Sequence, residues 1–240
     1  IKNDSILVFN SGILIQDRDP SSSVGDVISG NLPDAISLRD VTEAIRAAAK
    51  DKKIVGMLID GRQDSLNGYA SLKEVREALN EFKKAGKKIY AYDVNMTERE
   101  YYLDSLADEI WLNPMGGMEI NGFGAEQMFL AGALEKFGIG VQVVRVGSYK
   151  GAVEPFIRKD FSPENRQQTQ AFLNDLWTEF KNTTAGDRPV NAQMIQTLAN
   201  TQGIIKPEAA QQAKLVTKLA YFDEILDESV SQYKYEPEKY

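Results

Sequence analysis

The sequence contains no cysteine and no histidine among its 240 residues. The absence of cysteine excludes disulfide bonds and metal sites built from thiolates. The absence of histidine removes the commonest general base of enzymes and weakens any hypothesis of a transition-metal centre. Acyl-transfer chemistry, if the chain takes part in it, must therefore use serine, threonine, lysine or a carboxylate.

Long apolar runs and an excess of basic residues are also missing. No run in the sequence approaches the roughly 18 apolar residues of a membrane-spanning helix. The formal net charge of −7 argues against nucleic acid or an anionic membrane surface as the main partner, because both attract clustered lysine and arginine. The chain begins at Ile1 rather than at a methionine, so we expect that an export signal or an amino-terminal anchor preceded it.

Strand and helix patterns alternate through the first half of the chain. Runs of β-branched and aromatic residues predict strands at 5–10, 53–60, 88–93 and 109–112. Helical periodicity predicts helices at 37–50, 71–84 and 97–107. The second of these strands is apolar on both faces, which is typical of the buried centre of a parallel sheet. This order, with short turns, predicts an α/β fold with right-handed βαβ units around a mostly parallel sheet.

Local signals indicate where several of these elements begin and end. Serine or threonine followed three residues later by an acidic residue predicts helix starts at Ser37, Ser71 and Thr97. Gly86 is expected to end the second helix. Asn113-Pro114 is expected to stop the fourth strand, because proline has no N–H to donate to a sheet.

The sequence pattern of the second half of the chain predicts more helix than strand. An amphipathic helix is predicted at 125–137, a strand at 141–146, and a long helix from Pro163 to about Asn182. The residues expected on the buried face of the long helix are Phe172, Leu176 and Phe180. Shorter helices are predicted at 192–200, 207–213 and 222–232.

The remaining segments indicate loops and one boundary. Residues 13–15 resume the opening strand, as a strand pair or a bent strand, and residues 17–33 have the composition of a loop. The charged, proline-interrupted tail at 233–240 is more typical of a linker than of a domain end. We therefore expect a folded unit at 1–232 and a linker at 233–240.

Lys150 is the strongest candidate for a chemical role. It follows the predicted strand 141–146 and lies between Gly147 and Gly151, which permit close backbone approach and unusual φ angles. A lysine serves as a base only if burial lowers its pKa from about 10.4 to roughly 7–8. The apolar neighbours expected to provide this burial are Val146, Ala152 and Val153. The alternative is that Lys150 is an ordinary solvated loop charge.

Two other patterns are weaker. Asp60, Asp64 and Asp93 follow strand ends and could bind a hard cation such as Mg²⁺, but aspartate is also common in turns, so no metal is predicted. The glycines at 116–124 could hold a phosphate before a helix. However, no GxGxxG motif follows the first strand and no Walker lysine pattern is present, so no cofactor is predicted.

The segment from Val146 to Arg158, followed by Phe161-Ser162-Pro163, resembles the general-base segment of the long-form bacterial signal peptide peptidase A family, also called protease IV. The resemblance continues through Leu112-Asn113-Pro114 and spans the chain as the amino-terminal half of such an enzyme. It implies a serine peptidase of the ClpP/crotonase-like superfamily, with repeated ββα units and a mostly parallel sheet flanked by helices. It also implies that the tail leads toward a missing carboxyl-terminal half.

The resemblance makes Lys150 the general base of a Ser-Lys dyad. The serine nucleophile is expected from the carboxyl-terminal half, because Glu98-Arg99-Glu100 stands where the catalytic half of the family has a serine followed by two glycines. Ser65-Leu66-Asn67-Gly68-Tyr69 resembles a degenerate oxyanion segment, in which only Gly68 of a glycine pair remains.

The resemblance also implies a function for the intact protein. Such an enzyme degrades signal peptides left in the membrane after protein export, and this fragment alone is expected to be inactive. The implied partners are the cleaved signal peptides, the carboxyl-terminal half and further copies of the protein, expected as a tetramer around an enclosed chamber. The implied location is the bacterial inner membrane, with this soluble domain on the periplasmic side and the missing anchor in the membrane.

Two alternatives remain from the residues themselves. In the first, the chain is a non-catalytic scaffold of the same fold that mediates oligomerisation, and Lys150 forms an ion pair, for example with Glu154. In the second, it is a crotonase-type acyl-CoA enzyme. That chemistry requires paired oxyanion amides and usually acid–base carboxylates, and the sequence does not place them.

Overall fold

Residues 2–17, 35–144 and 146–225 are the part of the chain that the computed structural model describes. They divide into two compact units. The sheet unit contains residues 1–121 and 181–240, and the lysine unit contains residues 122–180. The expected loop at 17–33 and the expected linker at 233–240 lie almost entirely outside the described residues.

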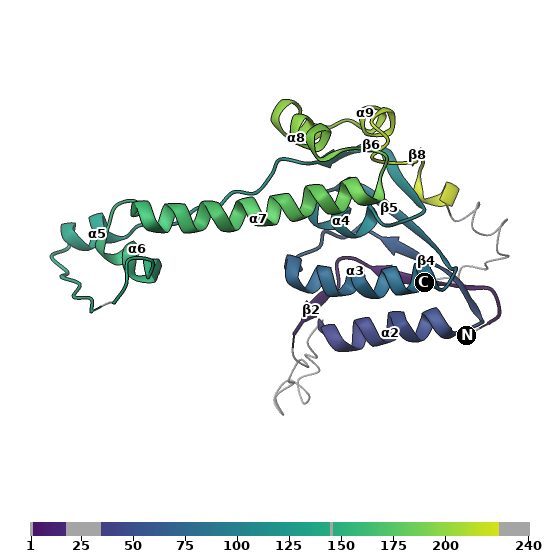
Figure 1. Ribbon diagram of the computed structural model, residues 1–240, viewed down its shortest axis with the longest axis horizontal. Coiled ribbons are helices and arrows are strands. Elements are labelled where there is room, and N and C mark those ends of the chain that lie inside the picture. Colours follow the sequence, from purple (N-terminus) through teal and green to yellow (C-terminus); the bar gives the residue numbers. More distant parts are fainter. Residues whose placement is uncertain (1, 18–34, 145, 226–240) are drawn as a thin grey trace. The chain divides into compact units, whose positions relative to one another are not determined.

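The sheet unit is built on a six-stranded, mostly parallel sheet in the order β1-β4-β5-β6-β7, with β8 paired to β6 (Figure 1). The parallel strands are β1 (Ser5–Asn10), β4 (Ile54–Asp60), β5 (Lys88–Met96), β6 (Glu109–Glu119) and β8 (Lys218–Leu219). Only β7 (Ile204–Ile205) pairs antiparallel among the described strands. The predicted α/β fold with a mostly parallel sheet is therefore confirmed.

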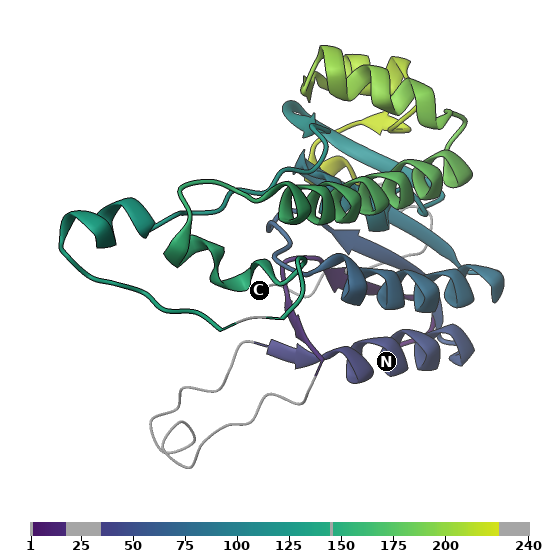
Figure 2. The same cartoon turned by 60° about the vertical axis from the view of Figure 1, so that its left-hand side comes forward.

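Helices flank this sheet. The first three are α2 (Leu38–Lys50), α3 (Tyr69–Lys84) and α4 (Glu98–Asp104). Helices α2 and α3 lie side by side (Figures 1 and 2). The later helices of this unit are α8 (Ala192–Thr201) and α9 (Pro207–Gln212). The core between helices and strands includes the fully buried side chains of Met57, Ile59, Leu79, Phe82 and Ile89.

Two of the predicted helix starts are confirmed. The Ser37 hydroxyl accepts a hydrogen bond from the Asp40 backbone N–H at 3.1 Å, which caps α2. Thr97 and Glu100 form a capping box at α4, in which the Glu100 carboxylate accepts the Thr97 N–H at 3.0 Å. The predicted cap at Ser71 is wrong. Helix α3 begins at Tyr69, because Gly68 adopts an extended conformation and its carbonyl accepts the Leu72 N–H at 3.0 Å.

The predicted end of the fourth strand at Asn113-Pro114 is also wrong, because β6 continues to Glu119. Its pairing with β5 shifts register between Asp93 and Asn95 and resumes at Gly117, so the proline falls where the ladder is interrupted. At the same place the Gly116 backbone lies against Val94, where any Cβ would overlap the Val94 carbonyl. The interrupted pairing and the close approach at Gly116 together allow β6 to continue beyond Pro114.

The opening strand does not pair with the segment that follows it. Instead β2 (Leu14–Gln16) pairs in parallel with β3 (Ala35–Ser37) as a separate two-stranded sheet. Residues 222–225 are helical, and the rest of the helix predicted to 232 lies outside the described residues.

The lysine unit differs most from its sequence pattern. Its elements are α5 (Ala131–Lys136), the 3₁₀ turn η1 (Gly151–Val153), α6 (Glu154–Ile157) and the first part of α7 (Pro163–Asp187). The helix predicted at 125–137 is thus reduced to α5. Residues 141–144 and 146 form no strand, and Val144 is fully exposed.

The shorter helix and the absent strand go together with exposure of the apolar side chains that the sequence pattern assigns to a buried face. Met128 and Phe137, which the helical pattern assigns to a buried face, are about three-quarters exposed, and Phe172 on α7 is 62% exposed. An amphipathic pattern forms a stable helix or strand mainly when its apolar face packs against a partner surface. Few residues of this unit are buried, and the only large apolar one among the described residues is Phe180, whose ring stacks on Trp177 at a centroid distance of 5.3 Å. Among the described residues, no helix combines the length and the apolarity that a membrane crossing requires.

Candidate functional site

Lys150 lies in the lysine unit, immediately before the 3₁₀ turn η1. Gly147, three residues earlier, has a φ of +99°, a left-handed conformation that glycine adopts without strain. The side chain of Lys150 is exposed, and its expected apolar neighbour Val146 is 79% exposed. The predicted burial of Lys150 by its own neighbours is therefore not found in this chain.

Glu154, the partner that the scaffold alternative gives to Lys150, is fully buried. Its Oε2 atom accepts hydrogen bonds from the Ser162 backbone N–H at 3.0 Å and from the Asn165 side-chain amide at 3.1 Å. Desolvation favours the neutral carboxyl group, but the hydrogen bonds from Ser162 and Asn165 outweigh it and lower the pKa of Glu154 to about 2. Glu154 is thus an ionised group held at the start of α7.

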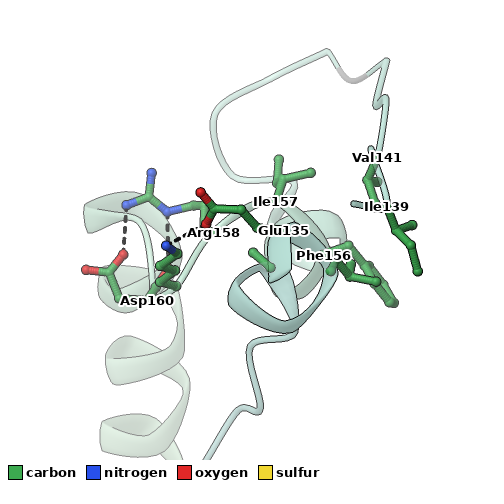
Figure 3. Close-up of a pocket in the computed structure, with 10 residues that line it drawn as sticks. Glu135, Ile139, Val141, Phe156, Ile157, Arg158 and Asp160 are labelled. Carbon is green, nitrogen blue, oxygen red and sulfur yellow. Dashed lines mark hydrogen bonds and ion pairs between the residues drawn. The ribbon is translucent and has the colours of Figure 1, made fainter. Parts of the chain in front are cut away.

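A hollow of about 580 Å³ lies in the same unit beside α5 and α6 (Figure 3). Ile139, Val141 and Phe156 form an apolar part of its lining. The charged part contains two ion pairs, Lys159 with Glu135 at 2.7 Å and Arg158 with Asp160 at 3.1 Å. The hollow therefore has one apolar side and one side whose charges are already neutralised within the unit.

The sheet unit brings together the two segments that the resemblance compares with a serine and an oxyanion site. Oε1 of Glu100 accepts the Ser65 backbone N–H at 2.5 Å, and Oε2 accepts the Thr97 N–H and the Thr97 hydroxyl proton. The carboxylate of Glu100 therefore accepts backbone N–H groups from both segments, that of Ser65 and that of Thr97. Residues 97–99 contain no serine, and the Ser65 N–H already donates to Glu100.

A buried acidic cluster around Glu100 is a feature that the sequence patterns did not predict. Asp93, Glu100 and Asp104 are each 1% exposed, although they come from β5 and α4. Burial, and then the charge of Glu100, raises the pKa of Asp93 to about 8. Burial, and then the charges of Asp93 and Glu100, also raises the pKa of Asp104 well above its ordinary value. The signal that could have found it is the spacing of Glu100 and Asp104, four residues apart on one helix face.

The three aspartates considered for a cation do not form a metal site. Asp60 forms an ion pair with Arg62 at 2.7 Å, and Asp93 is buried in the acidic cluster. Within residues 2–17, 35–144 and 146–225, no group of three or more carboxylates is arranged to hold a metal ion. The stretch at 116–124, considered for a phosphate, is partly strand β6 and does not begin a helix.

Comparison with known proteins identifies relatives of the chain. The model of peptidase family S49 matches residues 81–235. Protease 4 of Salmonella typhi is 35% identical over 159 residues, covering 66% of this chain and 26% of that protein. Protease 4 of Haemophilus influenzae is 33% identical over 200 residues, covering 81% of this chain and 32% of that protein. The chain thus spans between a quarter and a third of these relatives.

Solved structures were compared as well. One that is similar in fold is a mutant of a membrane-bound stomatin-specific protease, at 12% sequence identity and a TM-score of 0.49. The alignment covers 95% of this chain and 84% of that chain.

Proposed function

The chain belongs to peptidase family S49, and from this premise we propose that it is the base-donating half of a serine peptidase. In this proposal Lys150 is the general base of a Ser-Lys dyad, and the serine comes from a carboxyl-terminal half. The observation that carries the proposal is the exposed Lys150 in its family-like motif, combined with Glu98-Arg99-Glu100 at the position where a serine would be expected.

The chemistry requires a neutral lysine amine. Its lone pair takes the proton of the serine hydroxyl as the serine oxygen bonds to the peptide carbonyl carbon, and the resulting ammonium then protonates the departing amine. Water repeats the cycle and releases the acyl group from the serine. In this proposal the carboxyl-terminal half also encloses Lys150, because removal from water favours the neutral form of an amine.

Exposed apolar side chains on the lysine unit support the proposal that a partner covers this surface. Phe137, Val144, Val146 and Phe172 are all more than half exposed, although large apolar side chains are usually buried or grouped at interaction sites. The relatives are three to four times longer than the matched region, which leaves room for a second half. We propose the carboxyl-terminal half as the main partner, and a tetramer of the complete protein as the assembly.

The substrates that we propose are signal peptides left in the membrane after protein export. The support is the resemblance of residues 146–163 to signal peptide peptidase A together with the membership of family S49. We place the domain on the periplasmic side of the bacterial inner membrane, attached through an amino-terminal anchor. No cofactor takes part in this mechanism.

The test is peptide hydrolysis by the complete protein with Lys150→Ala. We expect turnover to fall by at least about 10²-fold, since general acid–base groups contribute about 10²–10⁴-fold to rates. Lys136→Ala is the matched control, because Lys136 is also an exposed lysine of the lysine unit. The chain of 240 residues alone is expected to show no turnover.

The second candidate function is the non-catalytic scaffold, which the exposed apolar surface of the lysine unit favours. It predicts that Lys150→Ala leaves turnover of the complete protein unchanged and that substitutions at Val144 and Phe172 dissociate the assembly. Unchanged turnover would make the scaffold the better account of this chain.

A further inference from the structure

The two neighbours of Lys150 both contact the beginning of α7. On one side, the Tyr149 hydroxyl donates a hydrogen bond to Oε1 of Gln167 at 3.3 Å. On the other side, the Gly151 backbone lies directly against the Asn165 side chain, and a Cβ at Gly151 would overlap that amide. Lys150 is therefore held between two contacts to residues that are two positions apart on one helix.

Glu154 connects the same turn to the same helix. Its backbone N–H donates to the Gly151 carbonyl, which closes η1, while its buried carboxylate accepts from Ser162 and Asn165. The Asn165 amide thus contacts Gly151 and donates to Glu154 at 3.1 Å. Because that hydrogen bond restrains the amide, Asn165 cannot easily move aside for a larger residue at Gly151.

We propose that Asn165 and Glu154 are positioning residues. They hold the backbone of Lys150 against the first turn of α7 and so restrict the orientation of its amine. The inference rests on the proposed function of Lys150 as a general base. A lysine side chain has several rotatable bonds and loses much conformational entropy when it is oriented. Fixing the backbone in advance removes the backbone part of the ordering cost, so that only the side chain remains to be ordered in the complex with the other half.

Asn165→Ala isolates this effect from the folding of α7. The Ser162 hydroxyl caps the helix by accepting the Asn165 backbone N–H at 3.1 Å, and this bond does not involve the Asn165 side chain. Alanine is also the best helix former. The substitution therefore removes the contact to Gly151 and the bond to Glu154 while the helix start is retained.

The experiment measures kcat and KM of the complete protein. We expect Asn165→Ala to lower kcat by about 10- to 100-fold with KM changed less than about twofold, because a small misplacement of a catalytic group acts on the chemical step. Gln168→Ala, at an exposed position of the same helix, is the control and should match the parent protein. An unchanged kcat in Asn165→Ala would overturn the proposal.

Two further variants separate positioning from a general loss of structure. As a single substitution, Gly151→Ala should lower kcat. In the Asn165→Ala background it should lower kcat by a smaller factor, because the space for the new methyl group is open there. Glu154→Gln keeps an oxygen acceptor and should retain more activity than Glu154→Ala. Strictly additive effects of Gly151→Ala and Asn165→Ala, or equal losses in both Glu154 variants, would contradict the proposal.

A measurement independent of activity is amide hydrogen exchange. The Glu154 N–H, which donates to the Gly151 carbonyl, should exchange faster in Asn165→Ala than in Gln168→Ala. If Asn165→Ala does not fold, Tyr149→Phe removes only the bond to Gln167 from an exposed side chain and should still lower kcat. Loss of activity in Lys150→Ala with normal Asn165→Ala would overturn only the positioning role, whereas normal Lys150→Ala would overturn the proposed function itself.

Discussion

The carboxylate of Glu100 accepts the backbone N–H of Ser65 at 2.5 Å, across 35 residues of sequence. The same side chain accepts the Thr97 N–H at the start of α4. A buried carboxylate thus satisfies donors from two loops at the carboxyl ends of β4 and β5. Glu100 therefore joins the two segments whose sequences resemble a serine position and an oxyanion segment.

We therefore expect Glu100→Ala to destabilise the sheet unit. The Ser65 and Thr97 N–H groups would lose their acceptor, and each buried unsatisfied donor costs about 1–3 kcal/mol. Urea unfolding followed by circular dichroism measures the change. Glu77→Ala, at an exposed position of α3, is the control and should change stability by less than about 0.5 kcal/mol. Equal stability of the two variants would show that the Glu100 contacts contribute nothing.

The raised pKa values of Asp93 and Asp104 predict a loss of stability with increasing pH. In the folded state the pKa of Asp93 is about 8, against an ordinary value of 3.8. Between these values the folded protein binds more protons than the unfolded chain, so the free energy of unfolding falls as pH rises. The part of the loss that comes from Asp93 ends above about pH 8, where this residue is ionised in both states.

Asp104→Asn tests this prediction. Both carboxylate oxygens of Asp104 are buried and have no hydrogen-bond partner among the described residues. The amide keeps the shape of the side chain but cannot ionise, so the variant should be more stable than the parent at pH 8, with a shallower fall between pH 5 and 8. Unfolding at several pH values measures both quantities. A slope identical to that of the parent would exclude Asp104 as a cause.

The lowered pKa of Glu154 predicts the opposite dependence, a loss of stability as the pH falls in the acid range. Its folded pKa of about 2 lies below the ordinary value of 4.5, so its contribution to stability is present above pH 4.5 and is lost as pH falls toward 2. Fluorescence of Trp177 follows the lysine unit, provided that Trp111 is replaced by phenylalanine. Glu154→Gln should reduce the dependence on pH between 4.5 and 2. The same acid transition in both proteins would contradict the assignment.

Asp187 at the end of α7 forms an ion pair with Arg76 of α3, in which Arg76 is buried and Asp187 is partly exposed. The same carboxylate oxygen accepts the Ser105 hydroxyl proton at 2.8 Å. Asp187→Ala should destabilise the sheet unit by about 3–5 kcal/mol, because it leaves the guanidinium charge buried without its partner. Asp175→Ala, at an exposed position of the same helix, is the control. Thermal unfolding of both variants is the measurement, and similar midpoints would refute the expected cost.

Two of the three helix caps predicted from local signals are present, and the third, at Ser71, is not. The caps at Ser37 and Thr97 depend on hydrogen bonds within three residues, and both are present. The mostly parallel sheet was predicted from the alternation of strands and helices along the chain. By contrast, Pro114 does not end β6, because it lies among the residues of β6 between Leu112 and Gly117 that have no partner on β5, and no local pattern reveals that interruption.

The lysine unit shows the limit of a periodic pattern. The apolar residues at 141–146 predict a strand and those at 125–137 a helix, but residues 141–144 and 146 form no strand and the helix is limited to 131–136. Periodicity states which side chains prefer burial, whereas a strand or an amphipathic helix also requires a surface that buries them.

The sequence by itself determined the parallel α/β order, the motif around Lys150 and the exclusion of histidine and cysteine chemistry, because these follow from residue types and from interactions between near neighbours. Only the tertiary structure decided that Glu100 occupies the Ser65 donor, that Asp93 and Asp104 share its burial, and that Asn165 contacts Gly151. These relationships join groups from different elements, whose proximity depends on the packing of the whole unit.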